Sequence, residues 1–245
     1  MIDEVFIASL VEHGFLRCGP SRGYVEFERK FEEYAAVLRT DGLRQDFSEL
    51  TSRLPESSGI SKVDYQPEDD PRGHKLSIQF EYDFADTVLW DEESVRPEIV
   101  ELAAAAVRLV RYDLMRSPIR LMAGDPSAQR STVRGIIYYP GSFPGVGWHT
   151  DGCVAQFISI PSGDRSLYVN RQLPPDRSVQ PEVTPGAVNV PGGPTPETLM
   201  LLGEQASYLA ELARATPHAV SALNAPRTVV THFVWRRDNP TGVAA

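Results

Sequence analysis

The chain has 245 residues, of which 42% are hydrophobic and 23% are charged, and its formal net charge is −9. This length supports one substantial core, so we expect a single domain over residues 1–245. The acidic balance argues against nucleic acid as a partner, because general nucleic-acid binding relies on a basic face. The sequence shows neither a long apolar segment nor an N-terminal signal pattern, so we expect no membrane partner and a cytoplasmic location.

Residues 1–130 read as a mainly helical part with extra strands. Aromatic and aliphatic side chains recur at helical spacing between charged residues, which predicts an amphipathic helix that packs its aromatic stripe on the core. A second helix is expected from Pro97 to Arg116. Between the two helices, residues 75–82 alternate apolar and polar side chains and predict an extra strand on the main sheet. The aromatic stripe consists of Tyr24, Phe27, Phe31, Tyr34 and Leu38.

The second half of the chain is dominated by short β-branched and aromatic runs separated by glycine and proline. Residues 154–160 form one such run, and we expect residues 166–171 to return beside it as a hairpin. The segment 173–197 holds seven prolines, so it is either a loop at the mouth of a site or a solvent-exposed insertion. The remaining runs predict strands over residues 134–139, 198–202, 215–220 and 227–235, with a helical turn or two over 203–213.

One pattern in these strands carries chemistry. Side chains alternate along a strand, so His149 and Asp151 point the same way, and His218 comes from a distant strand. Two imidazoles and one carboxylate that leave the other metal positions open are the facial triad of non-heme Fe(II) enzymes. An apolar strand loses stability when it buries such groups without a partner, and a metal ion is the simplest one. A His-Asp pair without metal is the alternative.

Zinc is a rival metal, because the same ligands also bind zinc with an open fourth position. A zinc hydrolase needs a general base beside the ion, and the chain has no His-Glu-x-x-His helix. Glu204 is the acid that we consider for that role. Halogenation is disfavoured, because that chemistry replaces the carboxylate ligand with a small residue and Asp151 is present.

The surroundings of the triad resemble a known family. The chain resembles the isopenicillin N synthase-like branch of the Fe(II)/2-oxoglutarate-dependent oxygenases over about residues 135–236. The resemblance implies a mainly β fold of the α+β kind, with a jelly-roll (double-stranded β-helix, cupin-like) core over residues 131–238 and flanking N-terminal helices. It rests on Tyr138-Tyr139-Pro140, Trp148-His149-Thr150-Asp151-Gly152, Leu201-Leu202-Gly203-Glu204 and Ala215-Thr216-Pro217-His218-Ala219-Val220.

The resemblance also implies a ligand set. Fe(II) would bind His149, Asp151 and His218, which are then both the metal ligands and the catalytic residues. The cosubstrate 2-oxoglutarate would place its far carboxylate on Arg227, whose planar guanidinium offers two parallel donors. Alternatively, Arg227 is an ordinary arginine at the edge of a strand and binds no cosubstrate.

Two positions depart from the family pattern. The family carries a hydroxyl two residues after the arginine, where this chain has Val229, and many relatives carry asparagine where it has Ile137. Strand parity makes Thr231 the best substitute for the missing hydroxyl. Tyr139 would hydrogen-bond the cosubstrate carboxylate, unless it is simply a core residue.

The activity that the resemblance implies is a dioxygenase reaction. With O2 and 2-oxoglutarate, such an enzyme hydroxylates, desaturates or cyclises a small amino-acid-like or natural-product substrate at an unactivated C–H bond. Val229 and Ile137 leave open an iron oxidase that uses no 2-oxoglutarate and holds a substrate carboxylate on Arg227. A non-catalytic jelly-roll binding module is the alternative from another class. Neither the primary substrate nor the oligomeric state follows from the sequence.

Overall fold

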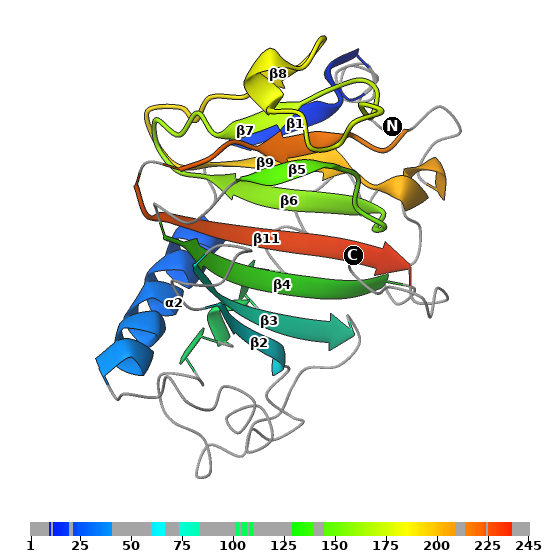
Figure 1. The fold of residues 1–245 in the computed structure, drawn as a ribbon. Helices are drawn as coiled ribbons and strands as arrows, with labels where there is room; N and C mark the ends of the chain where they lie inside the picture. The colour runs from blue at the N-terminus through cyan, green and yellow to red at the C-terminus, as the bar shows by residue number, and fades with distance from the viewer. Residues whose placement is uncertain are drawn as a thin grey trace.

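The computed structural model describes residues 10, 12–19, 22–40, 60–66, 74–83, 101–102, 104–106, 108–109, 129–139, 145–208, 214–223 and 225–236. These residues form a seven-stranded and a four-stranded antiparallel sheet (Figure 1). The larger sheet has the order β1 (Phe15–Gly19), β9 (Glu197–Leu202), β6 (Ala155–Ile160), β11 (Arg227–Arg236), β4 (Gln129–Tyr138), β3 (Lys75–Asp83) and β2 (Ile60–Gln66). The smaller sheet has the order β5 (Val146–His149), β10 (His218–Val220), β7 (Leu167–Val169) and β8 (Val188–Asn189).

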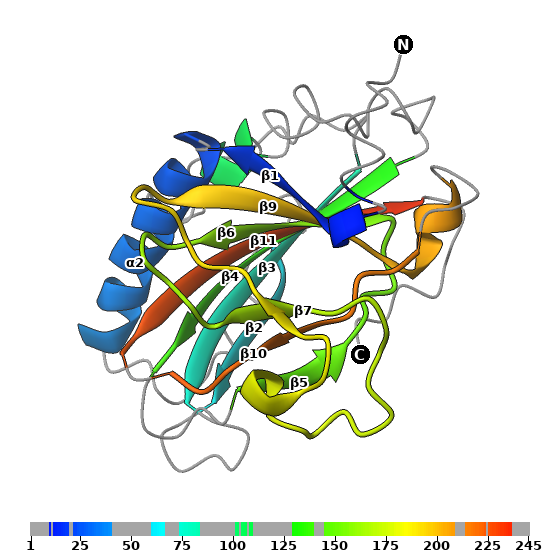
Figure 2. The ribbon, with the colours of Figure 1, turned by 90° about the horizontal axis from the view of Figure 1, so that it is seen from above.

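The large sheet lies between the helix α2 (Arg22–Thr40) and the small sheet (Figure 2). The face toward the small sheet is called the inner face here, and the face toward α2 the outer face. Strands of both sheets contribute apolar side chains to one inner core, as expected for a jelly roll. That core contains Ile158, Ile160, Leu167, Val169, Val190, Leu199, Leu201, Val220 and Val229.

Tyr24, Phe27, Phe31 and Tyr34 of the aromatic stripe of α2 are buried on the outer face, as the sequence predicts, and the side chain of Leu38 lies outside the described residues. Phe27 and Phe31 are fully buried, and the Phe27 ring meets the edge of Phe80 from β3 with ring centroids 5.9 Å apart. In the middle of β4, a Cβ at Gly135 would lie 2.9 Å from the Phe31 ring. Glycine therefore lets the helix approach the sheet closely, and a side chain there would overpack the core.

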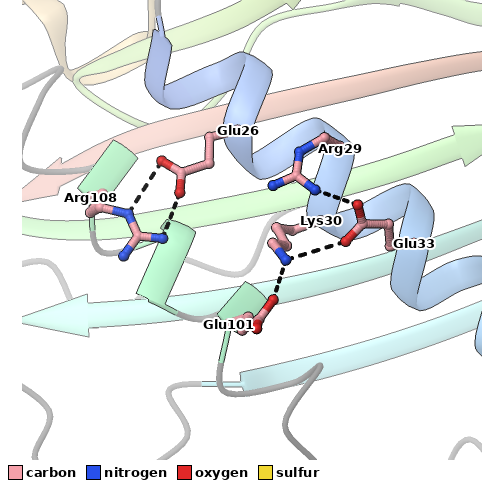
Figure 3. A network of polar contacts seen from close by, with 6 residues as sticks. All are labelled: Glu26, Arg29, Lys30, Glu33, Glu101 and Arg108. Carbon is pink, nitrogen blue, oxygen red and sulfur yellow. Dashed lines mark hydrogen bonds and ion pairs between the residues drawn. The ribbon is translucent and has the colours of Figure 1, made fainter.

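Helical residues within 101–109 complete the outer core, in agreement with part of the predicted second helix. Their apolar side chains Leu102, Ala105, Ala106 and Leu109 are buried. The rest of that predicted helix lies outside the described residues. Ion pairs join this segment to α2, from Arg108 to Glu26 at 2.7 Å and from Lys30 to Glu101 (Figure 3). These partners are at or near the surface, so each pair contributes little to stability.

The predicted hairpin after β6 is wrong. Strand β6 pairs with β9 on one side and with β11 on the other, so it has no open edge for the following strand. The turn 161–164 instead carries the chain to the small sheet, where β7 pairs with β10 and β8. Turn residues in the sequence indicate a reversal of direction, but they do not specify the sheet that the next strand joins.

The proline-rich segment 173–197 lies against the small sheet. It contains the 3-10 helix η4 (Pro181–Val183) and strand β8, and its last residue begins β9. The buried Trp148 donates its indole N–H to Thr184 Oγ1 at 2.9 Å, and its backbone N–H to the carbonyl of Arg177 at 3.0 Å. The segment therefore braces the strand that carries His149. Among the described residues, no helix is long and apolar enough to cross a membrane.

Candidate metal centre

The two histidines of the predicted triad lie side by side in the small sheet. His149 ends β5, His218 begins β10, and the two are register partners. His218 is also the register partner of Val169, which belongs to the inner core, so its side chain points between the sheets. Asp151 follows β5 after one residue. The structure thus brings together three residues that the sequence places on two distant strands.

The ligand atoms are close enough to share one ion. One atom from each of His149, Asp151 and His218 lies within 4.8 Å of the other two. The His218 Nε2 atom lies 3.4 Å from the Asp151 Oδ2 atom, and the two imidazole centroids are 4.2 Å apart. Ligands at right angles around an ion, each about 2.1 Å from it, lie about 3 Å from one another. Small side-chain rotations would therefore complete the site.

Backbone carbonyls orient both imidazoles in the same way. His149 Nδ1 lies 2.8 Å from the Gly147 carbonyl, and His218 Nδ1 lies 3.0 Å from the Thr216 carbonyl. A carbonyl only accepts, so each Nδ1 carries the proton and each Nε2 presents a lone pair. This arrangement, in which the far ring nitrogen donates to a second group, is typical of metal-binding histidines.

The electrostatics of the three side chains fit a cation. Asp151 Oδ2 is buried and makes no hydrogen bond within the described part of the chain. Burial lowers the pKa of His218, as does the nearby His149, while Asp151 and the Thr216 carbonyl act in the opposite direction. Neutral imidazole is the form that binds metals. A buried carboxylate oxygen that lacks a partner beside neutral imidazoles costs free energy, and a bound metal ion would remove that cost.

The loop that carries Asp151 is fixed to the end of β9. Thr150 donates its hydroxyl hydrogen to Glu204 Oε1 at 2.6 Å, and the Glu204 backbone N–H donates to the Asp151 carbonyl at 2.7 Å. A Cβ at Gly203 would lie 2.1 Å from the Cys153 carbonyl oxygen, so only glycine permits this approach. Glu204 begins the 3-10 helix η5 (Glu204–Tyr208). Its two hydrogen bonds hold the loop that carries Asp151, called the metal loop here, in place.

Arg227 lies at the opposite end of β11 from the metal loop. It is the first residue of β11, whereas Val234 near the other end accepts a hydrogen bond from the Val154 N–H, three residues after Asp151. The Arg227 side chain is buried, and its Nη2 lies 2.8 Å from Asp164 Oδ2. None of its three nitrogens makes an aligned hydrogen bond to a described residue, Nη2 included.

The Arg227 guanidinium therefore has unused donors in a buried place. Burial lowers its pKa, and Asp164 and Tyr138 oppose this shift. Arginine nevertheless remains protonated in proteins, so the buried group keeps its charge. Asp164 is itself held by Ser166, whose N–H and hydroxyl each lie 3.1 Å from one carboxylate oxygen. An additional carboxylate is the group that would satisfy this geometry best.

Tyr138, and not Tyr139, lies beside Arg227. The structure pairs Tyr138 with Arg227 in register, and Tyr138 packs on the inner core. Tyr139 instead packs against the outer core, and its ring stacks on His74 with centroids 4.2 Å apart. Tyr139 therefore lies on the outer face, and the tyrosine that shares the inner face with Arg227 is Tyr138, because the register between β4 and β11 decides which of the two points inward.

The hydroxyl expected from Thr231 does not reach Arg227 either. Thr231 lies on the inner face as predicted, but it donates to the Arg134 carbonyl at 3.4 Å. Val229, between the two, is an apolar member of the inner core. The side chain that contacts Arg227 is Asp164, from the turn between β6 and β7. The sequence offers no signal for this contact, since it depends on the path of the chain between the sheets.

Comparisons with known proteins point to one fold. The sequence matches no protein-family model, and no curated protein is significantly similar to it. The dioxygenase for auxin oxidation 1 of Arabidopsis thaliana, solved with 2-oxoglutarate, is similar with a TM-score of 0.56 at 14% identity, over 99% of this chain and 91% of that one. A full-length Neurospora crassa protein, solved in complex with alpha-KG, gives 0.52 at 12% identity, over 95% and 78% of the two chains.

A Caulobacter crescentus protein of the 2OG-Fe(II) oxygenase family gives a TM-score of 0.54 at 13% identity, over 95% of this chain and 80% of that one. At sequence identities this low, the structural likeness establishes the fold alone. The expected jelly roll is therefore confirmed by two independent observations, the sheet order and these likenesses. This chain has the double-stranded β-helix fold of the Fe(II)/2-oxoglutarate-dependent oxygenases, the family that its second half resembles in sequence.

Proposed function

We propose that the protein is a non-heme Fe(II)- and 2-oxoglutarate-dependent dioxygenase that oxidises a small molecule at an unactivated C–H bond. One observation carries this proposal. Among the described residues, the inner side of the barrel holds a carboxylate oxygen without a partner at Asp151 and a guanidinium without aligned partners at Arg227. The first group attracts a metal ion, and the second attracts an acid. The similar structures solved with 2-oxoglutarate or alpha-KG support the same assignment.

The proposed metal ligands are His149, Asp151 and His218. Their three ligand atoms would occupy one face of Fe(II) and leave the remaining positions for the keto acid and dioxygen. Bound Fe(II) and 2-oxoglutarate supply the oxidising power, as the keto acid loses CO2 and becomes succinate while O2 is consumed. The Gly147 and Thr216 carbonyls keep each imidazole in the tautomer that ligates.

The proposed cosubstrate anchor is Arg227, which would bind the far carboxylate of 2-oxoglutarate. Its burial makes this contact stronger than in water, because fewer water molecules screen the charges. Asp164 keeps the guanidinium charged and in place before the cosubstrate binds. Apolar side chains such as Val229 line the inner core and exclude water from the cosubstrate. Tyr138 is the phenol nearest to this anchor in register.

A zinc hydrolase has weaker support. The acid considered as its general base, Glu204, accepts a hydrogen bond from Thr150 and from there stabilises the metal loop. An iron oxidase without 2-oxoglutarate keeps one specific argument. Asp164 already neutralises part of the Arg227 charge, and no hydroxyl of β11 supports that arginine in the described contacts. In that enzyme Arg227 would hold a substrate carboxylate instead.

The test is a measurement of iron binding and of succinate formed per O2 consumed, on protein purified without oxygen. We expect one tightly bound Fe(II) and one succinate per O2. Asp151→Ala should lose both, whereas His13→Ala, which removes an exposed histidine, should lose neither. Oxygen consumption without succinate would favour the oxidase. Absence of iron affinity in the wild type would favour a non-catalytic binding module.

A further inference from the structure

The inner face of the large sheet changes character from one side to the other. Over β9, β6 and β11 it is mainly apolar and belongs to the inner core. Over β4, β3 and β2 the side chains of that face are mainly polar, apart from Ile136 and Tyr138 near the end of β4. On β3, Leu76, Ile78 and Phe80 point to the outer core, so their neighbours in sequence point inward. These polar residues are Asp64, Gln66, Lys75, Ser77, Gln79, Glu81, Arg130, Thr132 and Arg134.

Most charges on this polar face compensate one another. Lys75 lies 3.5 Å from Asp64, and Arg130 forms an ion pair with Glu81. Glu81 also accepts a hydrogen bond from the Gln79 amide at 3.1 Å. Every acid that the structure describes on this face therefore already has a basic partner.

Arg134 is the exception. Its side-chain contact is a long hydrogen bond of 3.5 Å from Nη2 to Ser77 Oγ. Within the described part of the chain, no carboxylate lies within ion-pair distance of its guanidinium. The side chain is half-buried, so its charge is only partly solvated. A guanidinium in this situation binds a carboxylate well, because its paired donors match the two oxygens.

The position of Arg134 is separate from that of the cosubstrate anchor. It lies near the middle of β4, in register with Thr231 of β11, whereas Arg227 is in register with Tyr138 at one end of this pairing. Arg227 is drawn toward Asp164 in the turn after β6, and Arg134 toward Ser77 on β3. The two guanidinium groups therefore lean to opposite sides of the sheet. Both still act on the phenol between them, since Arg134 and Arg227 oppose the upward shift that burial gives to the pKa of Tyr138.

We propose that Arg134 binds a carboxylate of the primary substrate, so that the enzyme oxidises an organic acid. The identification of this acid as the enzyme's substrate rests on the proposed function, whereas the anion site at Arg134 does not. Arg134 carries one positive charge and has no counter-ion among the described residues, so it matches one carboxylate. Ser77, also on the inner face, offers its hydroxyl to the same group. Because Thr231 is in register with Arg134, the bound acid would lie beside the inner-core stretch of β11.

The experiment uses three small acids, benzoate, phenylacetate and hexanoate, each compared with its own carboxamide. Binding is measured calorimetrically under anaerobic conditions on the full chain loaded with Fe(II) and 2-oxoglutarate. At least one acid should bind the wild type, and its carboxamide should bind at least tenfold more weakly. Arg134→Gln should weaken the acid at least tenfold and leave the carboxamide unchanged, while Arg134→Lys should give an intermediate loss.

Arg130→Gln is the matched control, because Arg130 lies on the same strand and face but is paired with Glu81. It should leave acid binding unchanged. The proposal is overturned if Arg134→Gln or Arg134→Lys binds the acid as well as the wild type does, if the carboxamide binds as well as the acid, or if none of the acids binds. Repeating the titration without iron and 2-oxoglutarate separates the two proposals. Acid binding that depends on Arg134 in a protein without iron affinity would retain the anion site and refute the dioxygenase.

Discussion

The barrel has unsatisfied groups of opposite charge at its two ends, the metal end around Asp151 and the arginine end around Arg227. Among the described residues, Asp151 at one end has a buried carboxylate oxygen that makes no hydrogen bond, and Arg227 at the other has a buried guanidinium without an aligned acceptor. The metal end requires a cation, and the arginine end requires an anion. Asp164 gives the arginine end a partial partner of its own, whereas the Asp151 oxygen lies beside the imidazole of His218 at 3.4 Å. The two ends should therefore differ in how strongly each depends on its ligand.

The largest effect is expected at the metal end. Asp151→Ala removes the only anionic ligand of the three, so affinity for Fe(II) should fall by about 1000-fold, or about 4 kcal/mol. Fe(II) at 100 times its Kd should stabilise the wild type by about 2.7 kcal/mol and should not stabilise the variant. Anaerobic thermal unfolding with and without the metal measures both. Equal stabilisation of the two proteins would contradict the assignment of Asp151.

At the arginine end, Arg227→Gln should weaken 2-oxoglutarate binding by about 100-fold, because a charge-assisted contact is lost in a buried place. Iron affinity should stay unchanged, since the two ends lie at opposite ends of β11. Arg236→Gln, near the far end of the same strand, is the control. Calorimetric titration with 2-oxoglutarate distinguishes the cases. A loss of iron affinity in Arg227→Gln would show that the ends are not independent.

Asp164→Asn tests whether Asp164 is a substitute partner for Arg227. Removing one member of a buried ion pair leaves the other charge uncompensated, so the ligand-free protein should lose about 3 kcal/mol of unfolding free energy. The cosubstrate carboxylate would then pair with Arg227, so 2-oxoglutarate should stabilise the variant more than the wild type. Urea unfolding with and without 2-oxoglutarate gives both values. A variant that 2-oxoglutarate stabilises no more than the wild type would remove this role from Asp164.

The same contrast explains what the sequence revealed. The metal ligands follow from a local motif and its spacing, so His149 and Asp151 could be expected close together without knowing the fold. The prediction that both lie on one strand is wrong, because β5 ends at His149 and Asp151 follows it. The arginine end depends on strand register and on a turn that changes sheets. The sequence therefore suggested Tyr139 and Thr231 where the structure places Tyr138 and Asp164 beside Arg227. The outer helix and its aromatic stripe were predictable, because they rest on periodicity. The jelly roll was expected from the family resemblance, and the pairing of β6 was not predictable.

Glu28 of α2 is a third acid, partly buried on the outer side of the sheet. A proton, rather than a ligand, neutralises this acid. Burial raises the pKa of Glu28 on α2 from 4.5 to about 7, and the neighbouring Glu32 adds to the shift. The folded protein therefore keeps this proton between pH 4.5 and 7 while the unfolded chain releases it. Since the folded state binds more protons in that range, the free energy of unfolding must fall as pH rises.

Glu28→Gln removes this penalty, so it should stabilise the protein by about 1 kcal/mol above pH 7, a modest value because solvent partly screens the carboxyl. Below pH 4.5 the two proteins should be equally stable. Urea unfolding at pH 4, 6 and 8 tests this, with Glu182→Gln as an exposed control. If the stability difference is the same at all three pH values, the pKa of Glu28 does not differ between the folded and the unfolded protein. Asp151, by contrast, lies beside two imidazoles in a cluster that could hold a metal ion, and that difference separates a structural acid from a candidate ligand.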